Sequence, residues 1–126
     1  MRYLLDTTVL IDHAQGRAGA ADLLRQLFDE TDDLYICDVV VAEALSKGVE
    51  EEVLVIGALI RSLEYVSTPP DAATWAGESR RRRGATSPRS LGDSIIAGIA
   101  WYMDATVVSR NPKDFESQGV SVLGYG

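Results

Sequence analysis

Short apolar runs alternate with segments of helical periodicity along the whole of this 126-residue chain. Runs typical of strands occupy residues 2–5, 34–37, 65–66, 106–109 and 120–123, and helical segments occupy 9–14, 20–28, 38–47, 50–63, 71–83 and a stretch opened by Ser87 and Pro88. Strands that are separated by helices pair in parallel, and the helices cover both faces of the sheet. The pattern therefore predicts one α/β domain over residues 1–126, with about five parallel strands.

Four acidic residues fall where the expected strands end or the expected helices begin. They are Asp6 after the first strand, Glu43 early in the helix after the second, Asp93 at the entry to a helix, and Asp114 beyond the 106–109 strand. Taken singly, each could cap a helix or face solvent. Taken together, they lie at the edge where open α/β sheets bind ligands, and clustered carboxylates repel one another unless a cation compensates them. The set predicts a divalent metal site.

The ligand types favour Mg²⁺ or Mn²⁺ over zinc, because the predicted site offers carboxylate oxygens and neither thiolates nor imidazoles. Cys37 is the only cysteine, which excludes a disulfide within the chain. His13 is the only histidine, and no serine in a nucleophile-elbow context accompanies it. Nucleophilic catalysis by a serine or cysteine triad therefore has no support.

The charge of −7 argues against nucleic-acid binding through overall charge, but positive charge is concentrated in one place. Arg80, Arg81, Arg82 and Arg83 stand together, with Gly84 and Arg89 behind them. Two interpretations stay open: the arginines stabilise a helix C-terminus with Gly84 beyond it, or they bind phosphates. Neither a membrane-spanning run nor a secretory leader is expected, so the default location is the cytoplasm.

Four sequence blocks resemble the PIN domain, and within it the small VapC toxins of toxin–antitoxin pairs. The blocks span residues 4–12, 41–45, 91–97 and 107–115, and read LLDTTVLID, VAEAL, LGDSIIA and VVSRNPKDF. Each block alone is weak, but together they cover nearly the whole chain in the family's order. The resemblance implies a single-domain PIN-like fold.

The resemblance also implies roles for particular residues. Asp6, Glu43 and Asp93 would form the acidic core that holds the metal. The fourth position stays open between Asn111 and Asp114, because family members place an acid at either and an amide oxygen supplies no charge. Thr7 and Ser109 match small hydroxyl positions that support the ligands.

A metal-dependent endoribonuclease is the activity that this resemblance implies. A cation held by the carboxylates would activate water against an RNA phosphodiester, leaving a 5′-phosphate and a 3′-hydroxyl, and one ion or two are both compatible with the ligands. The implied partners are RNA and a VapB-like antitoxin. A homodimer is also expected, because the apolar helix faces at residues 20–28 and 50–63 exceed what one small sheet needs to cover.

Three other interpretations agree less well with the sequence. A phosphatase of the haloacid dehalogenase type needs Asp-x-Asp, whereas the chain has Asp6-Thr7-Thr8. A receiver domain needs an early acid pair and a lysine after a later strand, and Lys113 alone could serve. An inactive PIN scaffold acting in binding or dimerisation would leave the mutually repelling carboxylates unexplained. The nuclease hypothesis accounts for all four acids.

Overall fold

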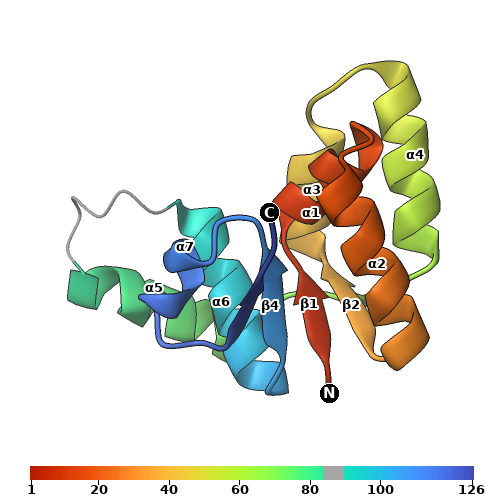
Figure 1. Cartoon of the computed structure of the whole chain (residues 1–126). Coiled ribbons are helices and arrows are strands. Elements are labelled where there is room, and N and C mark those ends of the chain that lie inside the picture. The colour runs from red at the N-terminus through yellow and green to blue at the C-terminus, as the bar shows by residue number, and fades with distance from the viewer. Residues whose placement is uncertain (84–89) are drawn as a thin grey trace.

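Five parallel strands form one sheet in the computed structural model, which describes residues 1–83 and 90–126 (Figure 1). The strands are β1 (Tyr3–Leu5), β2 (Leu34–Cys37), β3 (Glu64–Val66), β4 (Thr106–Ser109) and β5 (Val122–Gly124), in the order β3-β2-β1-β4-β5. In the register, Leu4 lies opposite Tyr35 on one side and Val107 on the other. The predicted five-stranded parallel sheet is confirmed.

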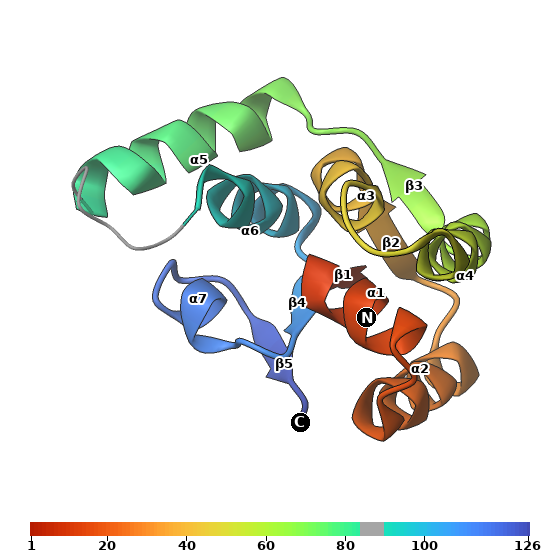
Figure 2. The same cartoon turned by 90° about the horizontal axis from the view of Figure 1, so that it is seen from above.

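Helices cover both faces of this sheet, with α5 and α6 on one face and α1 and α2 on the other (Figure 2). The helices are α1 (Thr7–Ala14), α2 (Ala18–Glu30), α3 (Asp38–Leu45), α4 (Glu50–Arg61), α5 (Pro70–Arg83), α6 (Leu91–Met103) and α7 (Lys113–Glu116). Six of them match the predicted helical segments to within a few residues, and the seventh, α7, is a short helix that carries Asp114. Within the described residues, no helix has the length and apolarity needed to cross a membrane.

One continuous apolar core holds the layers together. The central strands β1 and β4 contribute Leu4, Leu5, Val107 and Val108, all fully buried. Strands covered on both faces read as unbroken apolar runs, which is why these segments were recognisable in the sequence. Each fully buried leucine or valine contributes about 1.5–3 kcal/mol of hydrophobic stabilisation.

The strand order reverses between β1 and β4. From β1 the chain proceeds outward to β2 and β3, and it later returns to the other side of β1 to build β4 and β5. In open α/β sheets, a ligand binds outside the carboxyl ends of the strands at such a reversal. Asp6 follows β1 at this point, Ser109 ends β4, and the Asp6 N–H donates to the Val108 carbonyl at 2.9 Å. The topology thus fixes where the site lies.

The start of α6 differs from the prediction. The helix begins at Leu91, and its N-cap is Ser90, whose Oγ accepts a hydrogen bond from the Asp93 N–H at 3.0 Å. Ser87 and Pro88, which were expected to open this helix, lie outside the described residues. Leu91, the first helical residue, is 55% exposed.

Asp38 does not cap α3, because Cys37 occupies the N-cap position and Asp38 is the first helical residue. The Asp38 carboxylate instead accepts hydrogen bonds from the Thr68 N–H at 3.0 Å and from the Thr68 hydroxyl at 2.7 Å. This contact ties the segment after β3 to the carboxyl end of β2. Asp38 therefore braces the edge of the sheet at which the acidic residues gather.

Candidate active site

Asp6 is the most deeply buried of the predicted site residues, with 4% of its surface exposed at the end of β1. Its Oδ2 accepts hydrogen bonds from the Ser109 hydroxyl at 2.8 Å and from the Thr8 hydroxyl at 3.1 Å. Burial raises the pKa of Asp6, and the nearby Glu43 charge adds to the rise, while these hydrogen bonds and one from the Thr7 N–H oppose it. Ser109 thus contacts Asp6, a predicted metal ligand, directly.

Glu43 projects from α3 toward the same edge. The Thr7 hydroxyl donates a hydrogen bond to its Oε1 at 2.9 Å. Its carboxylate also lies against the first turn of α6, because a Cβ atom added at Gly92 would stand 2.9 Å from Glu43 Oε2. The glycine at position 92 therefore leaves room for Glu43 to approach α6.

Asp93 occupies the first turn of α6 and is half-buried. Its pKa is raised to about 6, first by burial and then by the negative charges of Asp6, Asp114 and Glu43. Each of these acids is therefore close enough to Asp93 to disfavour its ionised form. The structure brings together all four acids that the sequence singled out.

The two candidates for the fourth position lie on the segment after β4. Asp114 is half-buried in α7, and its backbone carbonyl accepts a hydrogen bond from Gln118 Nε2 at 2.7 Å. Asn111 is exposed, and its backbone N–H donates to Ser109 Oγ at 3.0 Å. Both residues line a cavity of about 410 Å³ that spans residues 110–114. Asp114 interacts electrostatically with Asp93, as a fourth acid would.

The donor chemistry of this site fits a hard divalent cation. All four acids offer oxygen, and the raised pKa of Asp93 means that the site already attracts a positive charge in the form of a proton. As the side chains stand, the described residues include no group of three carboxylate, imidazole or thiolate side chains close enough together to enclose an ion.

The four consecutive arginines form the last turn of α5. Arg81 and Arg82 are exposed, whereas Arg80 and Arg83 are half-buried. α5 packs beside α6 (Figure 2). Gly84 and Arg89 fall outside the described residues. This position is compatible with both roles considered above, support of a helix end and contact with phosphates.

Residues that the sequence reasoning did not select also contribute to the site. Thr8 donates to Asp6 and accepts a hydrogen bond from the Arg110 N–H at 3.1 Å. Arg110 Nη1 in turn donates to the buried Asp12 at 3.0 Å. A residue three positions after Val9 lies on the same face of a helix as Val9. A charged side chain at that position of a short apolar helix was the signal in the sequence that could have identified Asp12.

Comparison with known proteins assigns the class. The PIN domain family model matches residues 3–119, and the chain belongs to the PIN domain family. This match sets aside the phosphatase and receiver-domain interpretations of its acidic residues.

Among individual proteins, the chain is similar to Ribonuclease VapC19, found in two strains of Mycobacterium tuberculosis. The two sequences are 29% identical over 114 residues, which cover 89% of this chain and 90% of the relative. VapBC2 from Rickettsia felis, bound to a promoter DNA fragment, matches with a TM-score of 0.84 at 20% identity and covers 100% of both chains. DNA-bound VapBC from Salmonella typhimurium matches with a TM-score of 0.82 at 23% identity and covers 98% of both. These structures establish the shared fold.

Proposed function

We propose that this protein is a metal-dependent endoribonuclease and the toxin of a toxin–antitoxin pair. Membership of the PIN family and the similarity to Ribonuclease VapC19 support the activity. The observation that carries the proposal is the electrostatic coupling of Asp93 to Asp6, Glu43 and Asp114, where the strand order reverses. Such coupling leaves the site with excess negative charge. That charge attracts a cation, and it repels a phosphodiester that arrives without one.

Asp6, Glu43, Asp93 and Asp114 are the residues that would hold Mg²⁺ or Mn²⁺. When bound, such an ion lowers the pKa of a water and offsets charge on the leaving oxygen. The hydroxyls of Ser109 and Thr7 orient two of these carboxylates through the hydrogen bonds described above. In this proposal, the exposed amide of Asn111 orients a water or a phosphate oxygen.

Flanking phosphates of the RNA need positive charge of their own, because one metal site neutralises only the phosphate that is cut. Residues 80–83 offer four guanidiniums at one helix end. Four contacts to a single strand would contribute about −0.7 × 4, or about −3, to the slope of log affinity against log salt. Replacing all four with glutamine should flatten that slope, and an unchanged slope would assign the arginines to the helix end.

The direct test is cleavage of RNA by the purified protein. Activity should require Mg²⁺ or Mn²⁺, stop in EDTA, and fall to background in the Asp6→Asn variant. Asp32→Asn is a matched control, because Asp32 is exposed in the loop before β2, at the opposite edge of the sheet. Undiminished cleavage in EDTA, or full activity of Asp6→Asn, would overturn the proposal.

The proposed assembly is a homodimer that a VapB-like antitoxin inhibits by covering the acidic edge. The structural neighbours that are VapBC complexes support the second partner. Exposed apolar residues support association, since α4 leaves Leu54 68% exposed and α2 leaves Phe28 exposed. Sedimentation as a monomer at micromolar concentration would contradict the dimer, and an antitoxin bound away from the acids would contradict occlusion.

A further inference from the structure

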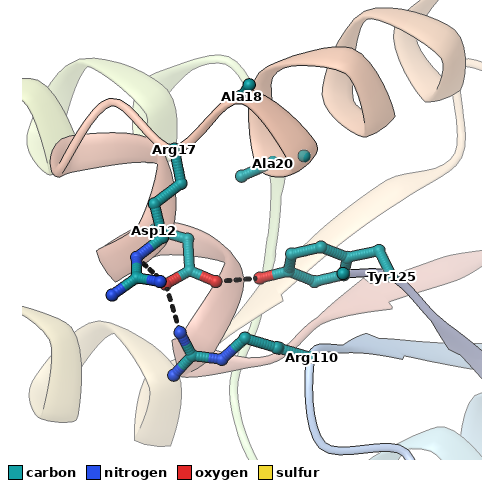
Figure 3. Close-up of a pocket in the computed structure, with 8 residues that line it drawn as sticks. Asp12, Arg17, Ala18, Ala20, Arg110 and Tyr125 are labelled. Carbon is teal, nitrogen blue, oxygen red and sulfur yellow. Dashed lines mark hydrogen bonds and ion pairs between the residues drawn. The ribbon is translucent and has the colours of Figure 1, made fainter.

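A second charged cluster lies beside the acidic site, and a buried carboxylate is at its centre (Figure 3). Asp12, on α1, is only 1% exposed. Its Oδ1 contacts Arg110 Nη1 at 3.0 Å and Arg17 Nε at 3.3 Å, and its Oδ2 accepts a hydrogen bond from the Tyr125 hydroxyl at 2.8 Å. These four residues, the Asp12 cluster, come from α1, the start of α2, and the segments after β4 and β5.

The cluster carries more positive charge than its carboxylate neutralises. Two guanidiniums share the single negative charge of Asp12, and the side chains of Arg17 and Arg110 are 58% and 39% exposed. A guanidinium has five N–H donors in a rigid fork, so contact with Asp12 leaves donors on each arginine for another acceptor. Asp12 also holds both side chains in place, which reduces the entropy lost when they bind a ligand.

A cavity of about 260 Å³ opens at this cluster, lined by Asp12, both arginines, Tyr125, Gly126 and the first turn of α2. The first turn of α2 has small side chains at residues 18–20, no acidic residue and no side-chain cap. The N–H groups at the start of a helix favour an anion, and residues 18–20 line the same cavity as the two guanidiniums, with the backbone of Gly126 beside Gly19. The arrangement is suited to a phosphate.

Arg110 links this cavity to the acidic edge. It directly follows Ser109, which donates to Asp6, and its own N–H donates to Thr8, which also donates to Asp6. Arg110 lines the neighbouring cavity as well, together with Asp114. A strand with one phosphate at the acids would therefore reach Arg110 with a phosphate farther along its backbone.

We propose that the Asp12 cluster binds a backbone phosphate of the RNA strand beside the one that is cleaved. Arg17 and Arg110 contact the phosphate, and Asp12 orients both arginines. This inference rests on the proposed nuclease function and adds a second contact region on the substrate, separate from residues 80–83. RNA is the occupant that the location favours, because the cluster continues directly into the acids that would act on a phosphodiester.

Arg17→Gln is the primary test variant, because the Arg17 side chain is largely exposed and Arg110 still contacts Asp12. Arg25→Gln is the matched control, since Arg25 lies on α2, the helix that Arg17 precedes as its N-cap residue. Its exposed side chain pairs only with the exposed Asp22 among the ion pairs of the described residues. Affinity for a single-stranded RNA oligonucleotide is measured in EDTA over a range of salt. Loss of one phosphate contact should flatten the log–log salt slope by about 0.7, and the Arg17→Gln, Arg110→Gln double variant by about 1.4.

A second measurement uses substrate length. With Mg²⁺ or Mn²⁺, Arg17→Gln should lower kcat/KM on a long RNA and leave it unchanged on a dinucleotide, which carries only the scissile phosphate. Thermal unfolding of each variant verifies the fold. If the Arg17→Gln, Arg110→Gln double variant unfolds because Asp12 is left buried without a guanidinium partner, Arg17→Gln alone still decides the question.

A salt slope for Arg17→Gln equal to that of Arg25→Gln would overturn the proposal and make the cluster a brace between α1 and the chain after β5. Weakened antitoxin binding with unchanged RNA binding would also overturn it, in favour of an acidic peptide. Failure of the nuclease function gives a different result, namely no cleavage by the wild-type protein with either metal.

Discussion

Asp93→Asn should make the metal-free protein more stable while abolishing its activity. In the folded protein, burial and three neighbouring acids raise the pKa of Asp93 from 3.8 to about 6. A tenfold change in proton affinity corresponds to about 1.4 kcal/mol, so ionised Asp93 destabilises the fold by at most about 3 kcal/mol. The side chain is only half-buried, and solvent screening reduces this to roughly half, about 1.5 kcal/mol.

The location of Asp93 at a helix N-terminus offsets part of this gain. A negative charge there is favourable by about 0.3–1 kcal/mol, and asparagine loses that contribution. The net expectation is about 1 kcal/mol at pH 8. For 126 residues, an unfolding entropy of about 2.1 cal/mol/K per residue converts this to a rise in Tm of about 4 °C.

The gain in stability of the Asp93→Asn variant should depend on pH in a defined direction. Because its folded pKa is raised, Asp93 binds its proton more tightly in the folded state than in the unfolded state. The wild-type protein therefore loses stability as pH rises from about 4 through about 6. The Asp93→Asn variant has no carboxyl at this position, so it does not show this loss of stability. The advantage of the variant should be absent near pH 4 and complete above about pH 7.

Thermal unfolding in EDTA at pH 4, 6 and 8 measures this dependence, with Asp32→Asn as the control for an exposed carboxylate at the other edge of the sheet. An Asp93→Asn variant that is less stable than wild type at pH 8 would refute the electrostatic reasoning. A stability gain of equal size at pH 4 and pH 8 would refute it as well, because protonated Asp93 carries no charge to repel.

The glycines supply further predictions. Gly98→Ala should destabilise the protein by about 1–3 kcal/mol in urea unfolding, because its Cβ would stand 2.5 Å from the Ala72 carbonyl oxygen between α6 and α5. Gly77→Ala, on α5 with open space around it, should instead stabilise by about 0.5–1 kcal/mol, and equal effects of the two would contradict the packing. Gly92→Ala should lower RNA cleavage with little change in Tm, because the added Cβ displaces the flexible Glu43 carboxylate, and unchanged cleavage rates would argue against a role for that position.

The fold and the acidic site were largely predictable because both follow from one-dimensional patterns. Buried parallel strands such as 106–109 read as apolar runs, and parallel strands end at a common edge. Asp6 and Ser109 therefore had to lie near each other once the strands were assigned. The start of α6 was misassigned because Ser87-Pro88 competed with Ser90-x-x-Asp93, a spacing that is also typical of a helix N-terminus.

The Asp12 cluster could not be predicted in the same way. Its contacts join residues that are 98 and 113 positions apart in the chain, Asp12 with Arg110 and Asp12 with Tyr125. Each lies on a different element, and no local periodicity relates them. Only the placement of β4 beside β1, and of β5 beside β4, brings these side chains together.

Calorimetric titration with Mn²⁺ tests the central claim most directly, namely that the four acids hold a divalent cation. Wild-type protein and the Asp32→Asn control should bind Mn²⁺ with equal affinity, and Asp6→Asn and Asp93→Asn should each bind it far more weakly while remaining folded. Mn²⁺ binding to Asp6→Asn with wild-type affinity and stoichiometry would place the ion elsewhere and contradict the account.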